Sequence, residues 1–146
     1  MKSVIRLLLV MSALLLVVNG KAQSWVNWTP NQLMEPSELA ATINTNKDSV
    51  TIINVGPGAI IPNSVDVGAV SEQAGLDKLK ATLSELPKDK KIVVYCGCCP
   101  FLHCPNVRPA INALKVLNFN NYYLLNLPNN IKQDWIEPGY PVVKKD

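Results

Sequence analysis

Residues 92–108 read IVVYCGCCPFLHCPNVR, and the pattern of this stretch is the clearest indication of the fold. Its first part, Ile92–Cys96, is rich in β-branched and aromatic residues, which predicts a strand buried on both faces. Its last part begins a helix, because Asn106 is a suitable N-cap residue and apolar residues follow it at helical spacing. These apolar residues are Val107, Ala110, Ile111, Leu114 and Leu117. The stretch therefore predicts a strand, a cysteine-rich loop and a helix in direct succession.

The sequence on either side of this stretch continues the alternation of strands and helices. We expect further strands at residues 50–55, 65–70 and 122–125, and further helices from Pro36, at 72–86 and around Trp135. Strands that alternate with helices need crossover connections, so we predict an α/β fold: a single domain with a parallel central sheet and helices on both faces. In such sheets ligands bind beyond the carboxyl ends of the strands, where Cys96 is expected to lie.

The first 22 residues have the composition of a signal peptide. Lys2 and Arg6 make a positive start, and the apolar run Leu7–Val18 is shorter than the about 20 residues that span a bilayer. The small residues Gly20 and Ala22 stand at the spacing that a signal peptidase reads, so we predict cleavage after Ala22. A retained membrane anchor is the alternative. The mature protein is thus expected to be exported, periplasmic or secreted, with no stable membrane insertion after cleavage.

Removal of the signal peptide changes the charge of the chain. The whole sequence has a formal net charge of +3, and its first 22 residues contain three basic residues and no acidic one, so the mature chain is neutral. Nothing in the mature sequence resembles the clustered basic surface that nucleic acids require, and no nucleic-acid partner is predicted. We divide the chain into a signal peptide (1–22), an N-terminal extension (23–35) and one domain (36–146).

Cys96 stands where a nucleophile is favoured, at the end of a buried strand and before a loop that leads into a helix. Loop N–H groups and the positive end of the helix stabilise a thiolate, which is the reactive form of cysteine. The same donors would hold an anion or a persulfide. We therefore expect main-chain donors to make the Cys96 sulfur acidic, and we expect that sulfur to be accessible. Arg108, in the first turn of the helix, is a candidate contact for an anionic substrate, with a solvated helix residue as the alternative.

Three more cysteines follow Cys96 within the same loop: Cys98, Cys99 and Cys104. They are candidates for resolving a persulfide, if the protein is a sulfurtransferase, or a disulfide, if it is a thiol-redox protein. Permanent disulfide bonds are one alternative, because four cysteines in an exported chain allow three pairings. A metal site is the other alternative, since the four thiolates and His103, the only histidine, would suit Zn²⁺, Cu(I) or an iron–sulfur cluster. Otherwise His103 is predicted to face solvent.

A buried strand that ends in Tyr95 and Cys96 precedes a loop, an apolar helix and a short strand, and Trp135 and the segment Gly139–Val142 follow. This order, which spans residues 36–143, resembles the rhodanese-like (thiosulfate sulfurtransferase-like) domain. The resemblance implies that Cys96 takes a sulfane sulfur, forms a persulfide and passes the sulfur to an acceptor thiol. It implies a small sulfur-containing anion or a thiol as donor, small or protein thiols as acceptors, and no required cofactor.

Three features depart from the pattern of that family. Residues 54–56 read Asn-Val-Gly where the family usually has Asp-Val-Arg, and residues 59–64 keep only the Ile-Pro of the usual Gly-His-Ile-Pro-Gly-Ala. The loop after Cys96 is longer and carries the extra cysteines. These departures favour, as an alternative function, a non-catalytic module of the same fold that binds a metal or a partner through its cysteine-rich loop.

Overall fold

The computed structural model of the chain describes residues 28–144. The predicted signal peptide and the first part of the predicted extension lie outside these residues. The elements are η2 (Pro30–Gln32), β1 (Leu33–Met34), α2 (Pro36–Asn46), η3 (Lys47–Ser49), β2 (Thr51–Asn54), β3 (Val65–Asp66), α3 (Gln73–Ser84), β4 (Ile92–Tyr95), η4 (Phe101–His103), α4 (Val107–Val116), β5 (Tyr122–Leu125) and η5 (Lys132–Ile136). Among the described residues, no helix is long and apolar enough to cross a membrane.

The strands form one five-stranded sheet in the order β1-β5-β4-β2-β3, and every neighbouring pair is parallel. β4 is the central strand, and its first residue, Ile92, pairs with Thr51 of β2 and Tyr122 of β5. All four residues of β4 are buried, as its β-branched sequence predicts for a strand covered on both faces. The carboxyl end of β4 therefore lies in the middle of one rim of the sheet.

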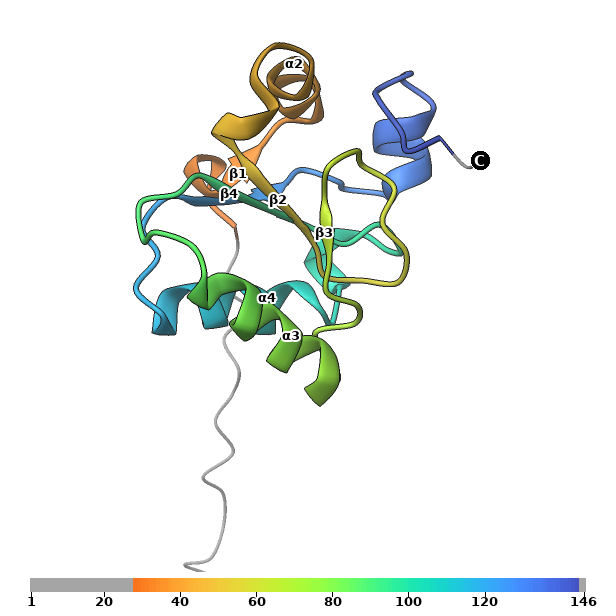
Figure 1. Cartoon of the computed structure of the whole chain (residues 1–146). Helices are drawn as coiled ribbons and strands as arrows, with labels where there is room; N and C mark the ends of the chain where they lie inside the picture. Colours follow the sequence, from red (N-terminus) through yellow and green to blue (C-terminus); the bar gives the residue numbers. More distant parts are fainter. Residues whose placement is uncertain (1–27, 145–146) are drawn as a thin grey trace, which may run out of the picture.

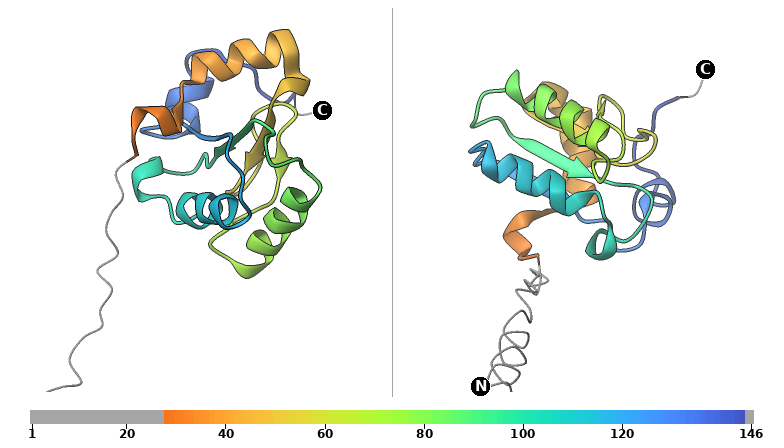
Figure 2. Two further views of the ribbon diagram at one scale, coloured as in Figure 1. Left: turned by 90° about the vertical axis from the view of Figure 1, so that its left-hand side faces the viewer. Right: turned by 90° about the horizontal axis from the view of Figure 1, so that it is seen from below.

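Helices cover both faces of the sheet (Figure 1). On one face α3 and α4 lie side by side (Figure 2), and their leucines Leu79, Leu83 and Leu114 are fully buried in one apolar cluster. On the other face, Leu39 of α2 and Trp135 of η5 belong to a second buried cluster. The predicted α/β domain, with a parallel central sheet and helices on both faces, is confirmed.

The structure adds an edge strand that the sequence analysis did not predict. β1 pairs in parallel with the last two residues of β5. Leu33–Met34 is too short to show a hydrophobic period, and it stands before Pro36, where we expected only an extension. At the opposite edge, β3 comprises Val65–Asp66 rather than the longer expected stretch 65–70. Both departures concern two-residue strands, whose pairing depends on the neighbouring strand more than on their own sequence.

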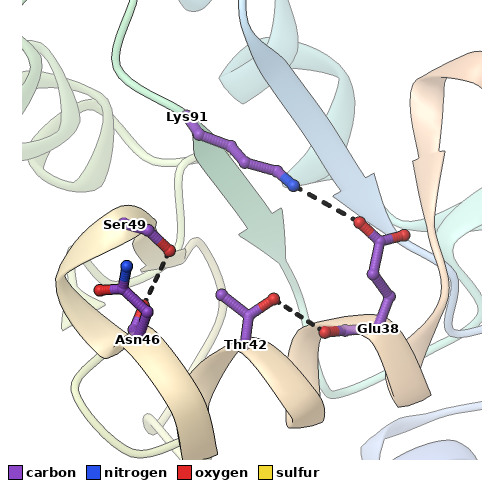
Figure 3. A network of polar contacts seen from close by, with 5 residues as sticks. All are labelled: Glu38, Thr42, Asn46, Ser49 and Lys91. Carbon is purple, nitrogen blue, oxygen red and sulfur yellow. Dashed lines mark hydrogen bonds and ion pairs between the residues drawn. The ribbon is translucent and has the colours of Figure 1, made fainter.

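A polar network ties α2 to the amino end of β4 (Figure 3). Lys91 Nζ, just before β4, lies 3.4 Å from Glu38 Oε1 of α2. Within the helix the Thr42 hydroxyl donates to the Glu38 carbonyl oxygen at 2.9 Å. These contacts lie at the end of β4 opposite Cys96, so they orient the helix on the sheet and leave the other rim to the cysteine-rich loop.

Candidate active site

The candidate site is the loop that joins the carboxyl end of β4 to α4, and Cys96 is its first residue. Two main-chain bonds hold this loop to the segment that follows β5. The Ile131 N–H donates to the Gly97 carbonyl oxygen at 3.1 Å. The Phe101 N–H donates to the Leu127 carbonyl oxygen at 3.3 Å. The loop therefore has a defined course across the rim of the sheet, as expected for a site built at a strand end.

Four cysteine sulfurs gather in this loop. The Sγ atoms of Cys96, Cys98, Cys99 and Cys104 all lie within 4.8 Å of one another. Cys98 Sγ lies between two of them, 3.3 Å from Cys96 Sγ and 3.4 Å from Cys99 Sγ. All four cysteines are free thiols in the structure. The fold thus brings together every cysteine of the chain, and such a group could hold a metal ion.

The four thiols differ in exposure. Cys96 and Cys104 are each only 2% exposed, whereas Cys99 is half-buried and Cys98 is exposed. The expectation that the Cys96 sulfur is accessible is therefore wrong for this conformation. The residue does follow β4 at the rim of the sheet, but it is buried in the apolar cluster that also contains Cys104 and Val107. The exposed sulfur beside Cys96 belongs to Cys98, which makes Cys98 the point of contact with solvent.

Hydrogen-bond donors surround the Cys96 sulfur and favour its thiolate. Together they lower the pKa of Cys96 from 9.0 to about 5; the bond from the Cys104 thiol is the largest cause, and burial acts in the opposite direction. The Cys98 N–H and the Cys98 thiol act in the same direction. Asn106 Nδ2, 3.6 Å from the sulfur, adds a further donor. The main-chain donor expected from the sequence is therefore present, but side chains contribute as well.

The thiols of Cys98 and Cys104 stay protonated at pH values at which Cys96 is a thiolate. Burial first, and then hydrogen bonds to Cys96 and Cys99, raise the pKa of Cys98 to about 12. The hydrogen bond that Cys104 donates to Cys96 raises the pKa of Cys104, although the N–H groups of Asn106 and Val107 act in the opposite direction. Since like charges at this separation disfavour one another, the loop concentrates its negative charge on Cys96.

Gly56 provides the space that the Cys96 side chain occupies. A Cβ atom at residue 56 would lie 2.5 Å from Cys96 Sγ, far inside van der Waals contact. The fully buried Asn54 fixes this turn, because its Nδ2 donates to the Gly56 carbonyl oxygen at 2.8 Å and to Asp66 Oδ1 at 3.0 Å. The Asn-Val-Gly sequence, which departs from the rhodanese-like pattern, therefore forms a wall of the sulfur site.

Asn106 has a different role from the one expected. It occupies the N-cap position of α4, but its side chain makes no capping hydrogen bond. Asn106 Oδ1 instead accepts a bond from the Ser71 N–H at 2.9 Å, and this contact directs Nδ2 toward Cys96 Sγ. Sequence reasoning missed Asn106 as a site residue. The available signal was its place at the start of the helix to which the cysteine-rich loop leads.

Arg108 and His103 lie outside the group of sulfurs. The Arg108 guanidinium carbon is 5.9 Å from the centroid of the Trp28 ring, and Trp28 packs edge-on against Phe101 at 6.5 Å. His103 is exposed in η4, and among residues 28–144 the group of possible metal ligands contains the cysteines without it. The structure therefore does not join His103 to the cysteines, and the anion contact of Arg108 stays a prediction.

Comparison with known proteins places the fold. No protein-family profile and no curated protein matches the sequence. The BH2092 protein of Bacillus halodurans matches the structure with a TM-score of 0.57 and 18% identity, over 75% of this chain and 74% of that chain. The single-domain sulfurtransferase RDL2 of Saccharomyces cerevisiae matches with a TM-score of 0.54 and 13% identity, over 74% and 90%. A thiosulfate sulfurtransferase of Pseudomonas aeruginosa matches with a TM-score of 0.53 and 15% identity, over 78% and 20%.

These matches define the class of domain. The chain has the rhodanese-like fold, which confirms at the level of structure the resemblance that the sequence motifs indicated. The chain corresponds to nearly all of the yeast protein and to one fifth of the Pseudomonas protein. A single domain of this fold therefore accounts for the described part of the chain.

Proposed function

We propose that this protein is an exported sulfurtransferase that carries sulfur as a persulfide on Cys96. The observation that supports the proposal most strongly is the set of donors aimed at the Cys96 sulfur from Cys98, Cys104 and Asn106. They favour the thiolate, which is the nucleophilic form, and they would equally stabilise a persulfide anion. Two proteins that share the fold are named sulfurtransferases, which agrees with this chemistry.

In the first proposed step the Cys96 thiolate attacks the outer sulfur of a small donor such as thiosulfate. A sulfur–sulfur bond forms on Cys96, the sulfur–sulfur bond of the donor breaks, and sulfite leaves with the bonding electrons. The reaction consumes no external oxidant or reductant and requires no cofactor. Because Cys96 is 2% exposed, the donor reaches it after the exposed Cys98 side chain turns outward. Arg108 is proposed to attract the anion at the start of α4.

In the second proposed step Cys98 receives the sulfur. Its Sγ lies 3.3 Å from Cys96 Sγ and is exposed. Attack of Cys98 on the outer sulfur of the persulfide, with loss of the Cys98 thiol proton to solvent, forms a new sulfur–sulfur bond on Cys98 and returns Cys96 as the leaving thiolate. A thiol with a low pKa leaves faster, so the acidity of Cys96 favours this transfer. Cys98 then presents the sulfur to an acceptor, which is a small thiol or a protein thiol.

Mass spectrometry of the reduced protein after incubation with thiosulfate tests the proposal. We expect the wild type to gain the mass of one sulfur atom, located by peptide mapping on Cys96 or Cys98. Cys96→Ser should gain none, while circular dichroism shows that it remains folded. Cys98→Ser should still load Cys96 but should release sulfur to an added thiol more slowly. Sulfur loading that is unchanged in Cys96→Ser would refute the assignment.

Export is a separate part of the proposal, and it rests on the composition of residues 1–22. The mass of the protein recovered from a bacterial periplasm or culture medium should correspond to a chain that begins at Gln23. A recovered chain that retains Met1, or that stays with the membrane fraction, would support the anchor instead.

A further inference from the structure

The four sulfurs are arranged closely enough to enclose a single ion. All four lie within 4.8 Å of one another, and Cys98 Sγ is 3.3 Å from Cys96 Sγ and 3.4 Å from Cys99 Sγ. Thiolates that bind zinc tetrahedrally at about 2.3 Å from the metal are about 3.8 Å from one another. The observed range brackets that value: to form the cage, the short contacts open by about 0.4–0.5 Å and the longest separation closes by up to about 1 Å.

Two of the four cysteines lie next to regular elements of the fold, and the other two lie on the loop between them. Cys96 and Cys104 are buried, one at the end of β4 and the other just before α4, so their places are set by the sheet and the helix. Cys98 and Cys99 lie on the loop between them, and Cys98 is exposed. This arrangement provides two fixed ligands and two outer ligands that close over an ion entering from solvent.

Hydrogen-bond donors lie close to two of the sulfurs and could offset the charge of thiolates bound to a cation. Cys96 receives bonds from the Cys98 N–H and from Asn106 Nδ2. Cys104 receives bonds from the N–H groups of Asn106 and Val107 at the start of α4. Donors of this kind orient metal-bound thiolates and offset their charge. Each thiol that binds the ion releases its proton to solvent, so binding is tighter at higher pH.

The donor set selects the kind of ion. The group consists of sulfur alone, without a carboxylate or an imidazole among residues 28–144. Sulfur ligands favour zinc, Cu(I) and iron–sulfur clusters over magnesium, calcium and manganese. A cluster spreads its thiolates over more than one iron, which requires wider separations than this loop gives. Four sulfurs around one centre match the tetrahedral geometry of Zn²⁺.

We propose that Cys96, Cys98, Cys99 and Cys104 form a four-thiolate Zn²⁺ site. The zinc site does not depend on the sulfur-transfer proposal, but zinc and the transferred sulfur would bind to the same lone pair of Cys96. A bound ion therefore excludes formation of the persulfide, and the metal-bound and sulfur-loaded forms of the protein are alternatives.

Titration of the reduced, metal-free full chain with Co²⁺ and then Zn²⁺ tests the site. We expect one equivalent of Co²⁺ to give the visible bands of a tetrahedral thiolate complex, and one equivalent of Zn²⁺ to abolish them. In competition with a chromophoric chelator, Cys99→Ser and Cys104→Ser should weaken Zn²⁺ binding by more than about tenfold. His103→Ala, which alters the exposed neighbour outside the sulfur group, should bind Zn²⁺ as tightly as the wild type.

Three results would overturn the zinc assignment. They are a Co²⁺ complex without thiolate charge-transfer bands, equal Zn²⁺ affinity in Cys99→Ser and the wild type, and tight binding of Cu(I) without tight binding of Zn²⁺. Cys99 is half-buried on the loop surface, so its variant stays informative even where Cys104→Ser does not fold. Zinc binding without sulfur loading from thiosulfate would refute the sulfur-transfer proposal alone, and the reverse would refute the metal site alone.

Discussion

Cys96 carries the charge that the sulfur chemistry needs, and its acidity can be measured directly. Its pKa is lowered from 9.0 to about 5, chiefly by the bond from the Cys104 thiol. We therefore expect one equivalent of thiolate, followed by ultraviolet absorbance under reducing conditions, to appear with a midpoint near pH 5. Cys96→Ser should lack this step. A first midpoint near the ordinary cysteine value of about 8.5 would contradict the hydrogen-bonding account.

The amide nitrogen of Asn106 is expected to help lower the pKa of Cys96. In Asn106→Asp one carboxylate oxygen can still accept the Ser71 N–H, but the other oxygen replaces a donor beside the Cys96 sulfur with a negative charge. The pKa of Cys96 should rise, and persulfide formation at pH 6 to 7 should slow. Asn106→Ala, which removes the donor without adding charge, should raise the pKa less. Equal pKa values in Asn106→Asp and the wild type would exclude the contact.

Gly56 is expected to tolerate a side chain only when the Cys96 sulfur is absent. In Gly56→Ala the new methyl group would overlap Cys96 Sγ, so the sulfur has to move and the free energy of unfolding should fall by about 1–3 kcal/mol. In Cys96→Ala the same Gly56→Ala change should cost much less. Urea denaturation of the four proteins measures this difference as a coupling energy. Additive effects would show that the two residues do not compete for space.

At single positions, the sequence supports a prediction that Cys96 is the nucleophile, but it does not show how the four cysteines are arranged. Cys96 could be singled out because a β-branched run ends there and a loop follows. The burial of Cys96 could not be read from the sequence, because it depends on packing against residues distant in the chain, such as Gly56. The roles of Gly56 and Asn106 were hidden for the same reason, since both act through contacts with other segments.

Among the elements, the end of β4 is joined to the connection between β2 and β3 by the Tyr95 hydroxyl. It accepts bonds from the Ile60 N–H at 3.0 Å and the Ile61 N–H at 3.3 Å. Tyr95→Phe leaves the N–H of the buried Ile61 without this acceptor, so the free energy of unfolding should fall by about 1–3 kcal/mol. Tyr122→Phe on β5 is the matched control, because no partner for that hydroxyl is seen within residues 28–144. Equal losses in the two variants, measured by urea denaturation, would assign no special role to Tyr95.

The elements that the sequence predicted most clearly carry a local signal of their own. β4 is entirely buried and apolar, and α3 has leucines at helical spacing, so both could be recognised from local residues. β1 has two residues and becomes a strand only because β5 offers a parallel partner. The extent of the sheet could therefore not be predicted at its edges, whereas its centre could.

In the whole molecule, the alternation of strands and helices is enough to predict the layers, because crossover connections constrain a parallel sheet strongly. The same argument predicted that the cysteine-rich loop lies at the carboxyl rim. It did not predict that all four sulfurs meet within 4.8 Å, because that depends on how one irregular loop folds back on itself. The local sequence thus specifies the fold, whereas the chemistry of the site depends on the tertiary structure of the loop.

Folding stability should depend on pH through Cys96. An acidic group whose pKa is lower in the folded state stabilises that state fully above its unfolded pKa, and this contribution is lost as the pH falls through the folded pKa. For Cys96 these limits are 9.0 and about 5. The free energy of unfolding should therefore rise from pH 5 toward pH 9, with a slope of at most about 1.4 kcal/mol per pH unit from this group. The raised pKa values of Cys98 and Cys104 act above that window, where they reverse the trend.

Comparison with Cys96→Ser isolates this contribution, because every carboxylate and lysine is common to the two proteins. In urea denaturation under strong reductant, the stability of the wild type relative to the variant should increase steadily between pH 5 and pH 9. Curves that stay parallel across that range would mean that the folded protein does not stabilise the Cys96 thiolate. The nucleophile of the proposed sulfur transfer would then have to lie elsewhere in the loop, with the exposed Cys98 as the next residue to test.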